Sequence, residues 1–147
     1  MRTVTVRTVV EGPGIEAEQL WYDHSRWASW IAGFAALQQL GEDWPLAGAR
    51  RVWVTRPDGR GLISETVRDY VAGDGQTLEF EDAKVRGVQR VLFQSDGTRT
   101  AITVTLDLET KDRTPPARRW WLRRRFRGEL ERTLERFSYE LAAERDR

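Results

Sequence analysis

Two carboxylates and one arginine are the side chains whose spacing could carry chemistry in this chain: Glu65, Asp69 and Arg50. They stand in runs that alternate apolar and polar residues, a pattern typical of strands with one buried face. If the Asp-Gly pairs at 58–59 and 74–75 form two-residue hairpin turns, all three charged side chains face the apolar side. A carboxylate there would anchor a ligand or act as a general acid or base. Two alternatives stay open, a β-bulge that reverses the facing and an internal ion pair with Arg50 that is only structural.

The only histidine, His24, lies in the aromatic stretch 21–34. Its neighbours Asp23 and Ser25 would point to different sides of a helix, which argues against a catalytic pair with either of them. The chain has no cysteine and no second histidine, so a zinc site is not expected, and it has no Gly-rich phosphate loop. We therefore expect His24 to be a helix-end or packing residue, and we expect no metal.

Composition sets the remaining bounds. The 147 residues suit a single domain, 1–147, that is long enough to bury a core. The 24 basic and 23 acidic residues leave a net charge of +1, so an electrostatic partner would have to recognise a local patch. The chain contains no apolar run of about 18 residues, so we expect no transmembrane helix. The absence of cysteine fits a reducing cytoplasm, which is the location we expect.

Periodicity and turn signals predict the order of the elements. Residues 3–11 alternate and predict a strand, and two short helical segments follow within 15–31. Residues 34–40 fit a helix or a strand. An apolar stripe of helical period predicts one long helix from about residue 117 to the end of the chain. The strands predicted between these segments are 50–56, 61–72, 76–82, 87–95 and 98–110.

The Asp-Gly pairs at 58–59, 74–75 and 96–97 also predict which side chains share a face. Directly opposed residues of an antiparallel pair lie on the same face. With two-residue turns, Trp53 faces outward while its neighbours Val52 and Val54 face inward. The other apolar or amide side chains expected inside are Ile63, Val67, Phe80, Gln89, Val91, Phe93, Ile102, Val104 and Leu106.

Residues 118–127 contain six arginines. On a helical wheel, Arg119 and Arg123 lie on the apolar side, whereas Arg124 and Arg125 point away. Basic residues at a helix N-terminus oppose the macrodipole, so helix stability does not explain them. We therefore hypothesise that Arg119 or Arg123 binds an anionic ligand group, such as a carboxylate or phosphate. The apolar side is formed by Leu122, Phe126, Leu130, Phe137 and Leu141.

Two other interpretations of segment 118–127 stay open. It is a solvated basic face balanced by the glutamates that follow it, or it contacts an anionic membrane surface, where Trp120 and Trp121 would mix well with arginine. Nucleic-acid binding is not expected, because the basic stretch is short and the net charge is only +1.

The segment LWYDHSRWASWIAGF (20–34), the Gly48 that opens GARRVWV, and the long terminal helix resemble the START-like, helix-grip superfamily, specifically its polyketide cyclase/dehydrase and lipid-transport branch. The resemblance implies an α+β fold in which a curved antiparallel sheet of six to seven strands wraps on the C-terminal helix, with two short helices after the first strand. The resemblance further implies that residues 34–40 form a strand. It also implies an internal cavity, an apolar ligand and no obligatory cofactor.

We therefore expect binding or transport of a small hydrophobic, lipid- or polyketide-like molecule, with or without an anionic group, between the sheet and the last helix. The first alternative is a cyclase or dehydratase in which Glu65, Asp69 or Arg50 polarises a carbonyl or moves a proton. The expected ligand-binding residues are Trp30, Phe34, Val54, Ile63, Val67, Phe80, Gln89, Val91, Phe93, Ile102, Val104, Arg119, Leu122, Arg123, Phe126 and Leu130.

The second alternative is a protein-interaction module without a small ligand, in which exposed Trp53, Trp120 and Trp121 form a contact patch. The sequence leaves open the identity of the ligand, whether the protein is an enzyme, whether the cavity is filled by its own tryptophans, and the oligomeric state.

Overall fold

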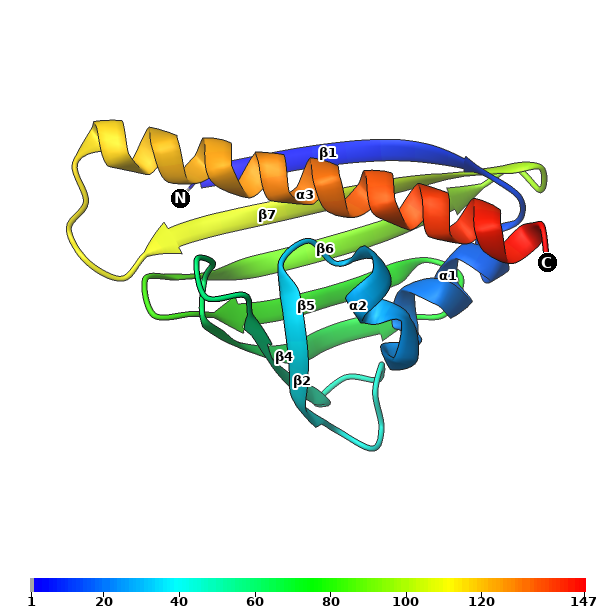
Figure 1. The fold of residues 1–147 in the computed structure, drawn as a ribbon, viewed down its shortest axis with the longest axis horizontal. Helices are drawn as coiled ribbons and strands as arrows, with labels where there is room; N and C mark the ends of the chain where they lie inside the picture. Colours follow the sequence, from blue (N-terminus) through cyan, green and yellow to red (C-terminus); the bar gives the residue numbers. More distant parts are fainter. Residues whose placement is uncertain (1) are drawn as a thin grey trace.

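Within residues 2–147, which the computed structural model describes with side chains from Thr3 onward, seven antiparallel strands form one curved sheet in the order β1-β7-β6-β5-β4-β3-β2 (Figure 1). The fold predicted from the sequence is confirmed, including the strand at 34–40. The strands are β1 (Arg2–Glu11), β2 (Phe34–Leu40), β3 (Arg50–Thr55), β4 (Leu62–Val71), β5 (Gly75–Glu81), β6 (Val85–Ser95) and β7 (Arg99–Thr110). The helices are α1 (Gly14–Tyr22), the short 3-10 turn η1 (His24–Arg26), α2 (Trp27–Trp30) and α3 (Pro116–Arg145).

The long helix α3 runs along β1 and covers the concave side of the sheet (Figure 1). Pro116 occupies its first turn, where the missing N–H costs no intrahelical hydrogen bond. The predicted apolar stripe faces the sheet, and its fully buried members are Phe126, Leu134, Phe137 and Leu141. The helix packs mainly on β1 and α2, so it covers the β1 side of the interior.

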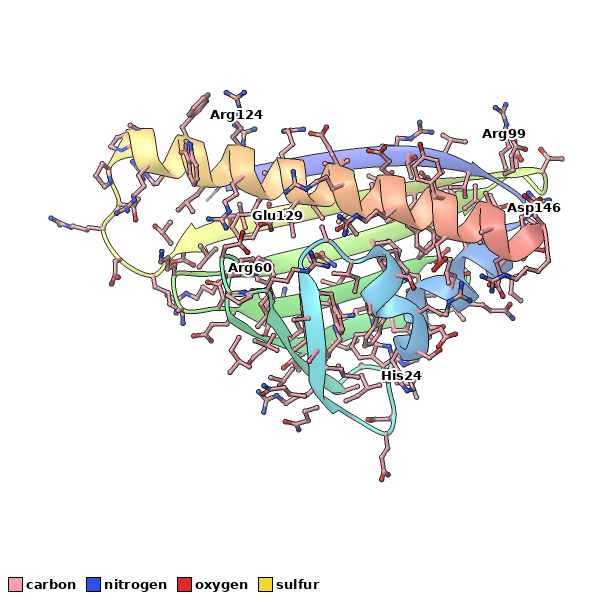
Figure 2. All side chains as sticks on the ribbon, in the orientation of Figure 1. His24, Arg60, Arg99, Arg124, Glu129 and Asp146 are labelled. Carbon is pink, nitrogen blue, oxygen red and sulfur yellow. The ribbon has the colours of Figure 1, made fainter. Side chains whose placement is uncertain are left out.

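The two short helices close one end of the interior. Trp27 is fully buried, and its Nε1 donates a hydrogen bond to the backbone carbonyl of Trp21 at 2.9 Å, which ties α2 to α1. Trp30 is 2% exposed, whereas His24 lies exposed at the start of η1. Figure 2 shows His24 on the outside of this end, as a helix-end residue.

The hairpin between β3 and β4 is one residue out of the predicted register. Trp53 pairs with Ile63, so it faces the interior and is only 5% exposed. Side chains alternate along a strand, and a shift of one residue therefore exchanges the two faces. Arg50, Val52 and Val54 lie on the outer face, and Arg50 is exposed. The predicted inward facing of these three residues is wrong, as is the outward facing of Trp53.

A β-bulge in β4 decides where the two candidate carboxylates point. Val67 pairs with Leu78, but Asp69 pairs with Thr77, so the strand contains one extra residue between them. Val67 stays inside at 2% exposure, as does Glu65 at 5%. Beyond the bulge, Asp69 is exposed. The prediction that Asp69 faces the interior is therefore wrong, for the reason that a bulge flips every side chain after it.

The turn between β6 and β7 is two residues longer than predicted, because Ser95 pairs with Thr100. A shift of two residues keeps each side chain on its face. The inward facing of Val91, Phe93 and Ile102 is confirmed, and all three are at most 4% exposed.

No helix within residues 2–147 is long and apolar enough to span a membrane. The cytoplasmic location stays a prediction of the sequence.

Candidate functional site

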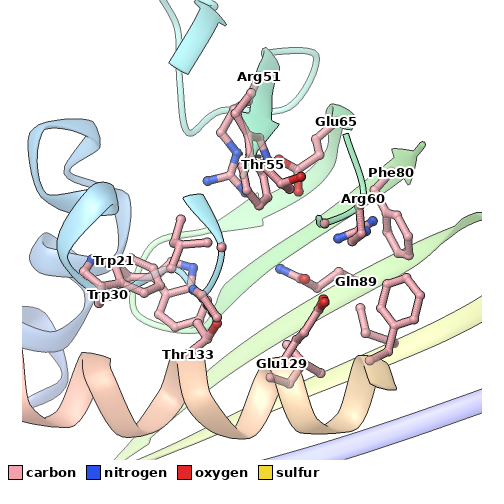
Figure 3. A pocket seen from close by; sticks show the side chains of 18 residues that line it. Trp21, Trp30, Arg51, Thr55, Arg60, Glu65, Phe80, Gln89, Glu129 and Thr133 are labelled. Atoms are coloured by element: carbon pink, nitrogen blue, oxygen red, sulfur yellow. Dashed lines mark hydrogen bonds and ion pairs between the residues drawn. The ribbon is translucent and has the colours of Figure 1, made fainter. Parts of the chain in front are cut away.

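The candidate site is a cavity between the inner face of the sheet, the β3–β4 loop (56–61) and α3 (Figure 3). Water-sized molecules can occupy about 90 Å³ of it, which is the volume of about three molecules of liquid water. Sites for drug-sized ligands typically measure about 300–1,000 Å³. In this conformation the cavity therefore has room for one small ring system.

Three tryptophans take up much of the interior. The rings of Trp21 and Trp30 are 4.7 Å apart between centroids, and Trp30 packs edge-on against Phe137 at 5.0 Å. Trp53 stacks on Phe34 with centroids 5.2 Å apart. The Nε1 of Trp30 is buried and has no hydrogen-bond partner among the described residues. Buried indole N–H groups are usually paired, so this one is a donor left free at the cavity wall.

A buried ion pair forms one polar end of the cavity. The Nε of Arg51 donates to Oε1 of Glu65 at 2.6 Å, and the Nε1 of Trp53 donates to the same oxygen at 2.7 Å. The side chains of Arg51 and Glu65 are only 8% and 5% exposed. The Arg51 guanidinium also lies over the rings of Trp27 and Trp44, at 4.5 and 4.8 Å from their centroids. The two charges balance each other. Side chains from β3, β4, α2 and the loop between β2 and β3 hold the pair in place.

Arg60 forms the second polar end. It follows the Asp-Gly of the β3–β4 loop, and its Nε donates to Oδ2 of Asp82 at 2.8 Å. The other oxygen of Asp82 accepts two backbone N–H groups of the β5–β6 turn, each at 2.8 Å. The Arg60 guanidinium lies 5.2 Å from the ring centroid of Phe80 and 4.7 Å from that of Phe126. Asp82 thus holds the arginine against the aromatic wall.

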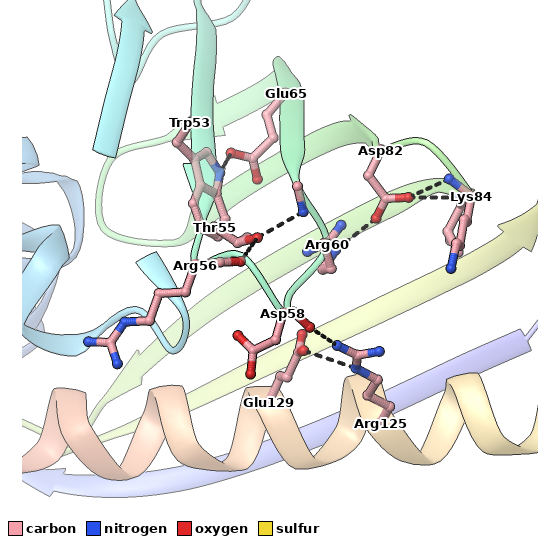
Figure 4. Close-up of polar contacts among 12 residues, drawn as sticks. Trp53, Thr55, Arg56, Asp58, Arg60, Glu65, Asp82, Lys84, Arg125 and Glu129 are labelled. Atoms are coloured by element: carbon pink, nitrogen blue, oxygen red, sulfur yellow. Dashed lines mark hydrogen bonds and ion pairs between the residues drawn. The ribbon is translucent and has the colours of Figure 1, made fainter. Parts of the chain in front are cut away.

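The mouth of the cavity is held by contacts between the β3–β4 loop and α3 (Figure 4). Arg125 Nη2 donates to the backbone carbonyl of Asp58 at 3.2 Å, while its Nε lies 3.6 Å from Oε1 of Glu129. The backbone N–H of Gly61 donates to Oγ1 of Thr55 at 2.8 Å, which closes the loop on itself. Arg125, predicted to point away from the apolar side of the helix, does not line the cavity but bridges α3 and the loop at its mouth.

The structure brings seven of the residues that the sequence places inside together in this cavity, namely Trp30, Glu65, Phe80, Gln89, Leu106, Phe126 and Leu130. Seven others are buried in the apolar packing around it: Phe34, Ile63, Val67, Val91, Phe93, Ile102 and Val104. Arg50, Val54 and Asp69 lie away from it. The part that any of these residues takes in binding stays a prediction.

Arg119, Leu122 and Arg123 line a separate hollow of about 120 Å³ on the far side of Phe126, near the start of α3. The Nε of Arg119 is buried there without a hydrogen-bond partner, whereas the Nε of Arg123 donates to the backbone carbonyl of Thr3 at 3.2 Å. The two arginines therefore do not reach the cavity between the sheet and the β3–β4 loop. Their contact with an anionic group stays a prediction.

Sequence reasoning missed four cavity residues that matter for its chemistry: Trp21, Arg51, Trp53 and Arg60. Arg51 and Trp53 were lost with the register error. Side chains two apart in a strand lie on the same face, so a prediction that places Trp53 inside would also have placed Arg51 inside. Arg60 stands in a loop, where periodicity carries no information about facing. No group of three His, Cys, Asp or Glu side chains within residues 2–147 is placed to hold a metal ion.

The model of the family described as polyketide cyclase/dehydrase and lipid transport matches residues 1–141. The chain belongs to this family. Family and fold are consistent with a domain that binds a hydrophobic ligand or acts as a polyketide cyclase or dehydrase. None of the curated proteins matches this family member by sequence.

Solved structures similar to this polyketide cyclase/dehydrase family member show the same fold. A START superfamily protein from Mycobacterium smegmatis is 14% identical, with a TM-score of 0.74 and coverage of 96% of this chain and 97% of that one. A conserved protein from Geobacillus kaustophilus is 14% identical, with a TM-score of 0.74 and coverage of 97% and 96%. Norcoclaurine synthase from Thalictrum flavum, in complex with dopamine and hydroxybenzaldehyde, is 10% identical, with a TM-score of 0.73 and coverage of 97% and 87%.

Proposed function

We propose that the protein binds a small, mainly apolar molecule in the cavity between the sheet and α3. One observation carries the proposal: an apolar and aromatic interior contains a few polar groups held in fixed positions, with the buried Arg51–Glu65 pair at one end and Arg60 at the other. Ligand sites typically combine such walls with a small number of polar groups that orient the ligand. Apolar surface removed from water stabilises the complex by about 25 cal/mol per Å².

Native mass spectrometry of the protein purified from its host tests this proposal. We expect a bound small molecule on the wild-type chain. An Ala32→Trp variant places a ring in the cavity and should lose that mass, because Ala32 lines the cavity. The matched control is Ala35→Trp at an exposed position of the neighbouring strand, which should retain it. Equal loading of both variants would contradict the proposal, as would a wild-type cavity that takes up no apolar probe.

Binding is favoured over a cyclase or dehydratase reaction by the state of the two carboxylates that line the cavity. Oε1 of Glu65 already accepts hydrogen bonds from two donors, and Glu129 lies 3.6 Å from an arginine of its own helix. A general acid or base needs a group that is free to exchange a proton with the substrate. A Glu65→Gln variant that abolishes turnover of a polyketide-like substrate while leaving its affinity unchanged would establish the enzyme instead.

We also propose that the start of α3 contacts an anionic membrane surface. Trp120 and Trp121 are 58% and 56% exposed, and they stand among the arginines of 118–127. Arg124 lies 5.5 Å from the ring centroid of Trp120, and Arg125 lies 5.9 Å from that of Trp121. Adjacent exposed tryptophans suit the membrane interface, and basic side chains near an anionic surface contribute about 1 kcal/mol each. The protein-interaction alternative loses Trp53, which is buried.

Sedimentation with vesicles tests the membrane contact. We expect binding to phosphatidylserine-containing vesicles, weaker binding to pure phosphatidylcholine, and loss of binding in Trp120→Ala/Trp121→Ala. Tyr139→Ala is the matched control, because Tyr139 is 70% exposed on the same helix but outside the segment. Retention of binding by the double variant would refute the contact, as would absence of binding to either kind of vesicle.

A further inference from the structure

The guanidinium of Arg60 has a buried edge that no protein group satisfies. Its Nε is bound to Asp82, its plane lies near the rings of Phe80 and Phe126, and its Nη2 is buried without a hydrogen-bond partner among the described residues. Arginine does not lose its proton in proteins, so this edge cannot be relieved by neutralisation. Buried polar groups are nearly always paired, which makes Nη2 a donor directed at a missing acceptor.

The charges around the cavity are already balanced. Each charged side chain that lines it has a partner of opposite sign, in the pairs Arg51–Glu65 at 2.6 Å, Arg60–Asp82 at 2.8 Å and Arg125–Glu129 at 3.6 Å. An anionic ligand would bring an unpaired charge into a largely desolvated space, which is strongly unfavourable. A neutral carbonyl oxygen would accept the Nη2 hydrogen bond and leave the charge balance unchanged.

We propose that the ligand of this cavity is a neutral, compact ring compound whose carbonyl oxygen accepts a hydrogen bond from Nη2 of Arg60. This inference rests on the proposed binding function and names the chemical class of its ligand. The carbonyl end lies by Arg60, with Gln89 and Glu129 pointing into the same space (Figure 3). The ring fills the apolar part toward Trp30. Arg60 is thus a specificity-determining residue for the carbonyl.

Three probes that share one carbon skeleton separate the contribution of the ring from those of a carbonyl and of a negative charge. They are indane, 1-indanone and indane-1-carboxylate. Their affinities are measured by following the indole N–H signals of the tryptophans in NMR titrations. In the wild type we expect 1-indanone to bind about tenfold more tightly than indane, because the carbonyl satisfies a charged donor. We expect the carboxylate to bind no better than indane.

The variants test whether Arg60 is the donor. Arg60→Lys keeps a positive charge to pair with Asp82 but removes the planar guanidinium and its Nη2 donor. This variant should therefore abolish the preference for the ketone. The double variant Arg60→Met/Asp82→Asn removes both charges and should do the same. Arg99→Lys is the matched control, because Arg99 lies at the start of β7, far from the cavity (Figure 2), and this variant should keep the preference. The indole signal of Trp27, whose N–H is bound to the backbone of Trp21, reports that each variant is folded.

The outcomes separate the two proposals. Equal affinity of indane and 1-indanone, or a ketone preference that survives both Arg60 variants, overturns this inference while binding itself stands. Tighter binding of the carboxylate than of the ketone overturns the neutral class. Binding of none of the three probes overturns the binding function and this inference together.

Discussion

Replacing Glu65 with glutamine should destabilise the fold more than any comparable change on the surface. The substitution keeps an oxygen that can accept the hydrogen bond from Trp53, now at 2.7 Å, and it keeps the side-chain volume. It removes the charge that faces Arg51 at 2.6 Å in a site where the two side chains are 8% and 5% exposed. The guanidinium is then left buried without its counter-charge.

Breaking a buried pair by removing one partner costs about 3–5 kcal/mol. The aromatic faces of Trp27 and Trp44 still lie within 4.8 Å of the guanidinium and retain part of its stabilisation, so we expect a loss of about 3 kcal/mol, the lower end of that range. For a domain of this size, 1 kcal/mol shifts Tm by about 2–4 °C, and Tm should fall by about 6–12 °C.

Urea unfolding followed by far-UV circular dichroism measures the free energy of unfolding of Glu65→Gln. The matched control is Glu79→Gln, because the Arg68–Glu79 pair lies on the outer face with its side chains 55% and 54% exposed. An exposed pair contributes less than about 1 kcal/mol. The double variant Arg51→Met/Glu65→Leu should recover most of the lost stability. If Glu65→Gln costs no more than Glu79→Gln, the buried pair is not what holds this end of the cavity.

Two further predictions concern the sheet. Gly87→Ala should lower Tm strongly, because an added Cβ would lie 2.1 Å from the backbone oxygen of Asp107, and thermal unfolding checks this against Ala at an exposed strand position. Hydrogen bonds from the backbone N–H of Arg99, followed by those of the backbone and side chain of Thr98, lower the pKa of Asp96 from 3.8 to about 2. The folded pKa lies below the unfolded one, so the stability that Asp96 contributes is present above about pH 4 and is lost as pH falls toward 2. Asp96→Ala should flatten this part of the pH profile of Tm, and an unchanged profile would refute the role of the turn.

Local sequence signals were enough for the order of the elements except at 34–40, which the family resemblance made a strand. The period of two in the strand segments and the apolar stripe from Leu122 to Leu141 each arise from neighbouring residues, and the elements they predict appear in the structure. The Asp-Gly pairs at 58–59 and 96–97 lie in turns as predicted, but the two-residue turn predicted at 74–75 is wrong, because Gly75 begins β5 and pairs with Val71. The turn at 96–97 shows how much error such signals tolerate. It is longer than predicted by two residues, and the facing of β6 and β7 was still right.

The polar site depended on details that local patterns do not carry. A shift of one residue in the pairing of β3 with β4 brought Arg51 and Trp53 inside and turned Arg50 out. One bulge in β4 left Glu65 inside and turned Asp69 outward. Whether a turn or strand takes an extra residue depends on the packing of the finished sheet.

By itself the sequence determined where most strands and helices lie, because hydrophobic periodicity is a property of each segment alone. The curved sheet with a helix across it was implied by the resemblance to the helix-grip superfamily. Only the tertiary structure decided that Arg51 meets Glu65 and that Arg60 enters the interior against Phe126. These contacts join β3 to β4, and a loop to a helix more than sixty residues away. The free energy of such contacts comes from burial and charge pairing that exist only once the elements have assembled.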